Sequence, residues 1–128
     1  QNDLQDIVHL PGVVNDVFEA HALHDVYVSA SYREGFPNAL LEACIAGRPA
    51  VVSDIDPHLE VLKGKEAGIC LSMEPEKWVE AFRGLIHDRQ RLKKMAENSR
   101  KTGLEHHISQ TAKKKIQFYE DLLQKRRA

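Results

Sequence analysis

The chain has 128 residues, of which 42% are hydrophobic and 29% charged, so it fits one soluble globular domain with a sizeable core. Its net charge of -1 argues against a general nucleic-acid binder, because such proteins depend on a dense basic surface. No apolar run approaches the roughly 18 residues of a membrane span, and the N-terminus lacks a signal core, so we expect a cytoplasmic protein.

Short apolar runs alternate with helical patterns in the first part of the chain. Strands are expected over residues 7–10, 26–28, 50–52 and 68–71. The expected helices between them cover residues 13–23 with a cap at Asn15 or Asp16, Pro37 to near Gly47, and a segment capped by Asp56 that ends at residue 62. Strands that alternate with helices predict an α/β fold with a parallel sheet.

From Pro75 onward the pattern is wholly helical. One helix is expected to start at Pro75, a second to be capped by Asp88 and a third by Ser109. The apolar stripe of the third helix consists of Ala112, Ile116, Tyr119 and Leu123. Basic runs at residues 113–115 and 125–127 are expected to form its solvated face, with peripheral contact to the inner face of an anionic membrane as the alternative.

One carboxylate interrupts the apolar helix that starts at Pro37. The helix is expected to be buried nearly all round, so Glu42 must be buried or face a cavity. An ionised carboxylate buried without partners is costly, and a polar group should therefore meet it. Either Arg48 forms an ion pair with Glu42, or a ligand hydroxyl group binds to it.

The start of the same helix lacks a capping side chain, because Gly35 and Phe36 precede Pro37. The amides of Gly35, Phe36, Asn38 and Ala39 have no obvious side-chain acceptor. Free amides and the positive end of the helix dipole together suit a phosphate or another anion.

Glu34 and Glu42 stand on either side of this anion position. Glu34 lies just before the helix, and Glu42 lies roughly 7 Å inside it with its side chain tilted back toward the start. A nucleotide diphosphate sugar carries hydroxyl groups on both sides of its phosphates and therefore matches the arrangement.

The stretch EGFPNALLEACIAGRPAVVSD resembles the C-terminal, donor-binding half of the retaining group 1 glycosyltransferases, which have the GT-B fold. In that family a Glu, seven residues and a second Glu are followed by a buried strand that ends in Ser-Asp; here these are Glu34, Glu42 and residues 51–54. The similarity continues through VHLPGVV, DVYVSAS and GICL. It implies a Rossmann-like parallel sheet with flanking helices.

The resemblance also implies residue roles. Glu34 would be the catalytic-site carboxylate that accepts hydrogen bonds from the donor sugar, and Glu42 would bind the ribose hydroxyls. The backbone of Gly35, Phe36, Pro37, Asn38 and Ala39 would hold the sugar and the diphosphate, and Gly12, Val13 and Val14 would read the nucleobase. The resemblance implies transfer with retention, no metal or other cofactor, and a UDP-linked hexose or N-acetylhexosamine donor for surface polysaccharide or glycoconjugate synthesis.

Compared with the family, residues 1–128 are expected to form a single partial domain. The two strand-helix units that precede VHLPG in the family, and its N-terminal acceptor domain, have no counterpart in this sequence. We therefore expect the fragment to be inactive by itself and to self-associate through open strand edges.

Two other functions remain open from the residues. One is a catalytically silent or regulatory domain that binds a nucleotide sugar, and the other is a glycoside hydrolase with Glu34 and Glu42 as its acid and base. The seven histidines show no metal-site spacing, so no metal site is expected. His58 is interpreted as a turn histidine, with substrate contact as the alternative.

Overall fold

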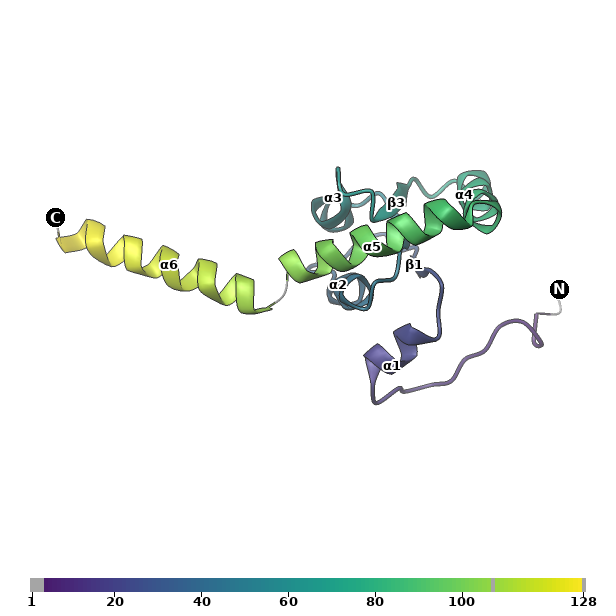
Figure 1. Ribbon diagram of the computed structural model, residues 1–128, viewed down its shortest axis with the longest axis horizontal. Coiled ribbons are helices and arrows are strands. Elements are labelled where there is room, and N and C mark those ends of the chain that lie inside the picture. Colours follow the sequence, from purple (N-terminus) through teal and green to yellow (C-terminus); the bar gives the residue numbers. More distant parts are fainter. Residues whose placement is uncertain (1–3, 107, 128) are drawn as a thin grey trace.

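The computed structural model describes residues 4–106 and 108–127, which form a small α/β body and a projecting C-terminal helix (Figure 1). The elements in chain order are α1 (Val17–Ala22), β1 (Tyr27–Ser29), α2 (Asn38–Ile45), β2 (Ala50–Ser53), α3 (Asp56–Leu62), β3 (Gly68–Leu71), α4 (Pro75–His87), α5 (Arg89–Glu105) and α6 (Ile108–Arg127).

The three strands form one parallel sheet in the order β1-β2-β3. In its register, Val28 lies opposite Val51, and Val51 lies opposite Ile69. A helix makes each crossover, α2 between the first two strands and α3 between the last two, as parallel pairing requires. The predicted Rossmann-like parallel sheet with flanking helices is confirmed, and the carboxyl ends of the strands meet at one edge.

Strand β2 is the centre of the fold, because all four of its residues are buried. Its side chains alternate between the two faces of the sheet. Ala50 and Val52 join an apolar cluster with α2 and α3, whereas Val51 joins a second cluster with Leu85 of α4 and Met95 of α5. Helices therefore cover both faces of the sheet, which explains why the strand reads as a continuous apolar run.

Helix α5 crosses the C-terminal end of α2 at very close range. A Cβ atom on Gly103 would lie 2.3 Å from the backbone nitrogen of Ile45 and 2.6 Å from the carbonyl carbon of Cys44, so glycine is needed there. The hydroxyl of Ser99 donates to the carbonyl of Arg48 at 2.6 Å, and Arg100 donates to the carbonyl of Ile45 at 3.3 Å. Helix α5 thus supplies donors to carbonyls at and beyond the end of α2 and fixes the position of that helix.

The expected strand at residues 7–10 is wrong. Residues 8–14 have no regular structure, and the side chains of Ile7 and Leu10 are 73% and 90% exposed. Figure 1 shows this segment standing away from the sheet. A strand needs a neighbour for its backbone groups, and the described residues pair no strand with this segment.

The helix starts agree with the sequence in part. Asp16 caps α1 by accepting from the amides of Phe18 and Glu19, and Asp88 caps α5 by accepting from the amide of Arg91. The expected cap at Asp56 is wrong, because Ile55 occupies the cap position and Asp56 is the first helical residue. Helix α6 starts at Ile108, so Ser109 lies inside it rather than before it.

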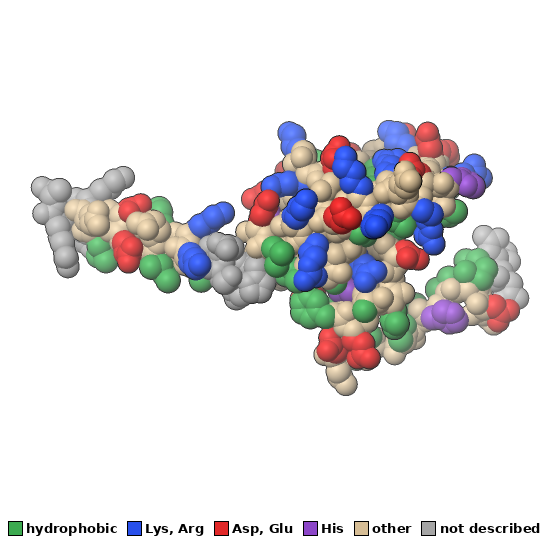
Figure 2. All heavy atoms as spheres, viewed as in Figure 1, with side chains coloured by type: hydrophobic (Ala, Val, Ile, Leu, Met, Phe, Trp, Pro, Cys, Tyr) green, Lys and Arg blue, Asp and Glu red, His purple; other side chains and the backbone are tan. Residues whose placement is uncertain are grey.

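Helix α6 extends away from the rest of the molecule (Figure 1). The side chains of Ile116, Tyr119 and Leu123 from the predicted stripe are each more than half exposed. Figure 2 shows hydrophobic side chains along this helix and charges of both signs over the main body. None of the described helices combines the length and apolar character that a bilayer crossing requires.

Candidate functional site

The loop after β1 carries Glu34 to the carboxyl edge of the sheet. Ser29, the last residue of β1, donates its hydroxyl hydrogen to Oε1 of Glu34 at 3.3 Å and also lies 3.0 Å from the hydroxyl of Ser31. The Glu34 side chain is 25% exposed, so it is held by the protein and still accessible to a ligand. The carboxyl edge of a parallel sheet is where open α/β proteins bind ligands.

A histidine from the neighbouring crossover meets the same carboxylate. His58 of α3 is fully buried, and its Nε2 lies 3.3 Å from Oε1 of Glu34. Its Nδ1 lies 2.9 Å from the backbone carbonyl of Ser53, the last residue of β2. The hydroxyl of Ser53 in turn donates to the carbonyl of Ser31. The ends of β1 and β2 are thus joined in one polar network around Glu34.

This network favours the ionised form of Glu34. The hydroxyl of Ser31 makes the largest contribution to holding the pKa of Glu34 below its ordinary value, and the charge of His58 and the hydroxyl of Ser29 act in the same direction. Partial burial opposes them. A carboxylate surrounded by donors stays charged at neutral pH and accepts hydrogen bonds.

The start of α2 next to Glu34 has free amides. Pro37 occupies the cap position and no side chain caps the helix. No protein acceptor is found for the amides of Gly35, Phe36 and Ala39 within the described residues. A Cβ on Gly35 would have open space around it, so the backbone there is accessible.

The prediction of a free amide is wrong for one of the four residues, Asn38. The amide of Asn38 donates to the carbonyl of Phe36 at 2.9 Å and closes a tight turn before the helix. Pro37 is buried, whereas the side chains of Asn38 and Ala39 are exposed at the helix start. Of the four amides predicted to be free, those of Gly35, Phe36 and Ala39 therefore remain available.

Glu42 lies further along α2 and is half-buried, less than the sequence predicted. The ion pair with Arg48 is not formed, because Nη1 of Arg48 donates to the carbonyl of His24 at 2.7 Å. Within the described residues the carboxylate of Glu42 has no ion-pair or hydrogen-bond partner. Its charge acts on His21 of α1, whose pKa is lowered chiefly by burial and by His24, with Glu42 opposing the shift.

The three residues expected to read the nucleobase precede α1 in the irregular segment. Gly12 has a positive φ of 76°, and Val13 and Val14 are 95% and 47% exposed. The structure therefore brings Glu34 and the start of α2 together, while the irregular segment before α1 stands away from the sheet (Figure 1).

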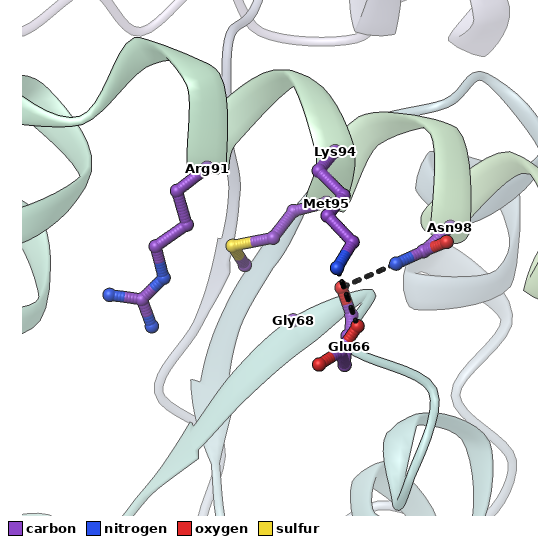
Figure 3. Close-up of a pocket in the computed structure, with 6 residues that line it drawn as sticks. All are labelled: Glu66, Gly68, Arg91, Lys94, Met95 and Asn98. Atoms are coloured by element: carbon purple, nitrogen blue, oxygen red, sulfur yellow. Dashed lines mark hydrogen bonds and ion pairs between the residues drawn. The ribbon is translucent and has the colours of Figure 1, made fainter.

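A separate pocket of about 290 Å³ lies at the other edge of the sheet (Figure 3). It is lined by Glu66, Gly68, Arg91, Lys94, Met95 and Asn98. Glu66 forms an ion pair with Lys94 at 3.4 Å. Because Gly68 is the first residue of β3, this pocket is at the amino end of the strands, opposite the edge with Glu34. Nowhere in residues 4–106 and 108–127 do three His, Cys, Asp or Glu side chains gather as a metal site would require.

The part that sequence reasoning missed is the contact between His58 and Glu34. The sequence interpretation gave His58 either a turn position or a substrate contact, and the structure places it fully buried in the first turn of α3. A usable signal was its position. A histidine that follows the end of one parallel strand lies at the same edge as a carboxylate that follows the end of its neighbour.

Comparison with known proteins identifies the family of the chain. The family described as glycosyl transferases group 1 matches residues 1–102. An N,N'-diacetylbacillosaminyl-diphospho-undecaprenol alpha-1,3-N-acetylgalactosaminyltransferase of Campylobacter jejuni is 26% identical over 91% of this chain and 31% of its own length. A putative glycosyltransferase EpsD of Bacillus subtilis is 28% identical over 84% of this chain and 29% of its own length.

The chain thus spans about three tenths of the length of these relatives. The family match covers both glutamates, the uncapped helix and the whole described sheet. The chain belongs to the group 1 glycosyltransferases.

Proposed function

We propose that this chain binds the nucleotide diphosphate sugar donor of a retaining glycosyltransferase. Glu34 accepts hydrogen bonds from the hydroxyl groups of the transferred sugar, and the amides of Gly35, Phe36 and Ala39 bind the diphosphate. Glu42 accepts hydrogen bonds from the two ribose hydroxyls, and the backbone at Gly12, Val13 and Val14 contacts the base.

The observation that carries this proposal is the arrangement of the two carboxylates around the start of α2. The pKa of Glu34 is lowered by its hydrogen-bond partners, its carboxylate contacts Ser29 and His58, and its side chain is still 25% exposed. Glu42 is half-buried on α2, and its carboxylate has no ion-pair or hydrogen-bond partner in the described residues. Free amides lie between them, so acceptors for hydroxyl groups flank donors for an anion.

The charge of the diphosphate is offset in this proposal by the helix dipole and backbone amides, and no metal ion takes part. The leaving diphosphate helps to deprotonate the acceptor hydroxyl, so transfer with retention needs no protein nucleophile. This division of roles leaves Glu34 as the carboxylate that orients the sugar.

We propose a UDP-linked hexose or N-acetylhexosamine as the donor and a surface polysaccharide or glycoconjugate as the product. The name of the Campylobacter jejuni relative specifies transfer of N-acetylgalactosamine to a diphospho-undecaprenol compound. An acceptor of that kind is proposed to place this domain at the inner face of a membrane.

The test is calorimetric titration, which measures the Kd for UDP-hexoses, UDP-N-acetylhexosamines and GDP-sugars. It uses the full-length gene product that contains this chain, called the intact protein below. Glu42→Ala should weaken donor binding by about 1.5 to 3 kcal/mol, or roughly 10- to 150-fold in Kd, through the lost ribose contacts. Glu97→Ala removes the same charge from the exposed face of α5 and should leave Kd unchanged. Unchanged affinity in a folded Glu42→Ala variant would contradict the ribose role.

Transfer assays with an acceptor mixture separate the proposal from its alternatives. Donor binding without transfer by the intact protein would indicate a catalytically silent domain. Release of sugar from glycosides that carry no phosphate, with no affinity for nucleotide sugars, would indicate a hydrolase instead.

A further inference from the structure

The buried histidine beside Glu34 has contacts at both ring nitrogens. Its side chain is fully buried, with Nδ1 at 2.9 Å from the carbonyl oxygen of Ser53 and Nε2 at 3.3 Å from Oε1 of Glu34. Nε2 is buried and forms no aligned hydrogen bond within the described residues, so Glu34 lies at ion-pair distance from it and is its nearest charged group. The ring therefore bridges the end of β2 and the loop that follows β1.

The geometry of these contacts constrains the protons that the ring can carry. A carbonyl oxygen only accepts hydrogen bonds, so Nδ1 must carry a proton to bond with Ser53. The hydroxyl of Ser53 donates its hydrogen to the carbonyl of Ser31 and does not supply one to Nδ1. A neutral ring would then turn the lone pair of Nε2 toward the carboxylate of Glu34, which is repulsive. A ring protonated at both nitrogens meets the carboxylate with a donor and a compensating charge.

We propose that His58 is a positioning residue that holds Glu34 as an imidazolium–carboxylate pair. Its ring is fixed by Ser53, and it keeps the carboxylate ionised and turned so that the remaining lone pairs face the donor sugar. A fully buried charge is costly without a partner, and the Glu34 carboxylate supplies that partner. This inference rests on the proposed role of Glu34 in donor binding.

The first experiment measures the protonation of His58 directly and needs no substrate. The intact protein is labelled with 15N-histidine, and the imidazole nitrogen shifts of His58 are recorded at pH 7 without donor. Assignment comes from loss of the signal in His58→Gln. Protons on both ring nitrogens are the expected result, and an unprotonated Nε2 would overturn the proposal.

The second experiment uses two substitutions that each keep one of the two contacts. Asn at position 58 can still donate to the carbonyl of Ser53 but does not reach Glu34, whereas Gln can place its amide nitrogen near the position of Nε2. His58→Asn should weaken donor binding by about 10- to 100-fold, and His58→Gln should recover a clear part of that lost affinity. Equal affinity of His58→Asn and wild type would overturn the proposal. Where neither variant folds, the nitrogen shifts of the wild-type protein decide alone, with the ring signals assigned by through-bond correlation to the backbone of His58.

A double-mutant cycle separates this inference from the proposed function. In a Glu34→Ala background, His58→Asn should cause no further loss of donor affinity, because the carboxylate on which it acts is gone. If Glu34→Ala itself leaves affinity unchanged, the proposed function fails while the nitrogen shifts still report on the pair. If Glu34→Ala weakens binding and His58→Asn adds its full effect in that background, the positioning role fails and the function stands.

Discussion

Gly103→Ala should destabilise the fold at the crossing of α2 and α5. The new Cβ would lie 2.3 Å from the nitrogen and 2.7 Å from the Cα of Ile45, and both atoms belong to the backbone. No side chain can rotate out of the way, so the helices must separate by about 1 Å before ordinary contact is restored. Overpacking of this kind costs about 1 to 3 kcal/mol, whereas the better helix propensity of alanine returns up to about 1 kcal/mol.

The assay is urea unfolding followed by circular dichroism, with Gly84→Ala on α4 as the matched control. A Cβ at Gly84 meets only Arg91 at an ordinary 3.9 Å, so that substitution should stabilise the protein by up to about 1 kcal/mol. The two glycine substitutions should therefore move the free energy of unfolding in opposite directions. A shift of the same sign and size in both would refute the steric reasoning.

Gly103→Ala should also weaken donor binding at the proposed site. Because α5 fixes the end of α2, movement of the crossing displaces the helix that carries Glu42. Gly103→Ala in the intact protein should therefore raise the Kd for donor more than Gly84→Ala does.

Three further predictions follow from buried groups and open edges. The pKa of His21 is lowered from 6.5, mainly by burial, so the unfolded chain takes up a proton at a higher pH than the folded chain does. The free energy of unfolding should therefore drop between pH 7 and pH 5.5 in urea titrations, and His21→Phe should make this dependence on pH shallower. An unchanged slope would exclude His21 as its cause. Ser99→Ala should cost about 1 to 3 kcal/mol in the same unfolding assay, because the carbonyl of Arg48 loses its 2.6 Å donor, and a cost near zero would mean that water replaces it. The 128-residue chain by itself should self-associate in sedimentation runs at rising concentration, since β1 has one unpaired edge among the described residues and Val28 is 49% exposed; a monomer at all concentrations would contradict this.

Much of the fold follows from local pattern. Residues 50–52 and 68–71 are short apolar runs between turn residues, and both are strands in the structure. Pro75 at a helix start and Asp88 as a cap express backbone preferences that depend on few neighbours. Such elements are predictable because the signal lies within a few residues.

The errors occur where a distant partner decides. The run at residues 7–10 has the composition of a strand, but a strand exists only when another pairs with it, and none of the described strands does. The sequence shows no side-chain acceptor for the amide of Asn38, yet in the structure this amide donates to the backbone carbonyl of Phe36 in a tight turn.

The sequence by itself determined the parallel α/β plan, the uncapped start of α2 and the pair of glutamates on either side of it, because periodicity, proline and missing caps act locally. Only the tertiary structure decided that Arg48 turns to the carbonyl of His24 instead of Glu42, and that His58 meets Glu34 across two strand ends. Hydrogen bonds and ion pairs form only when two groups come within about 3 Å of each other. The sheet and its crossovers decide which segments approach that closely, and the spacing of residues along the chain does not.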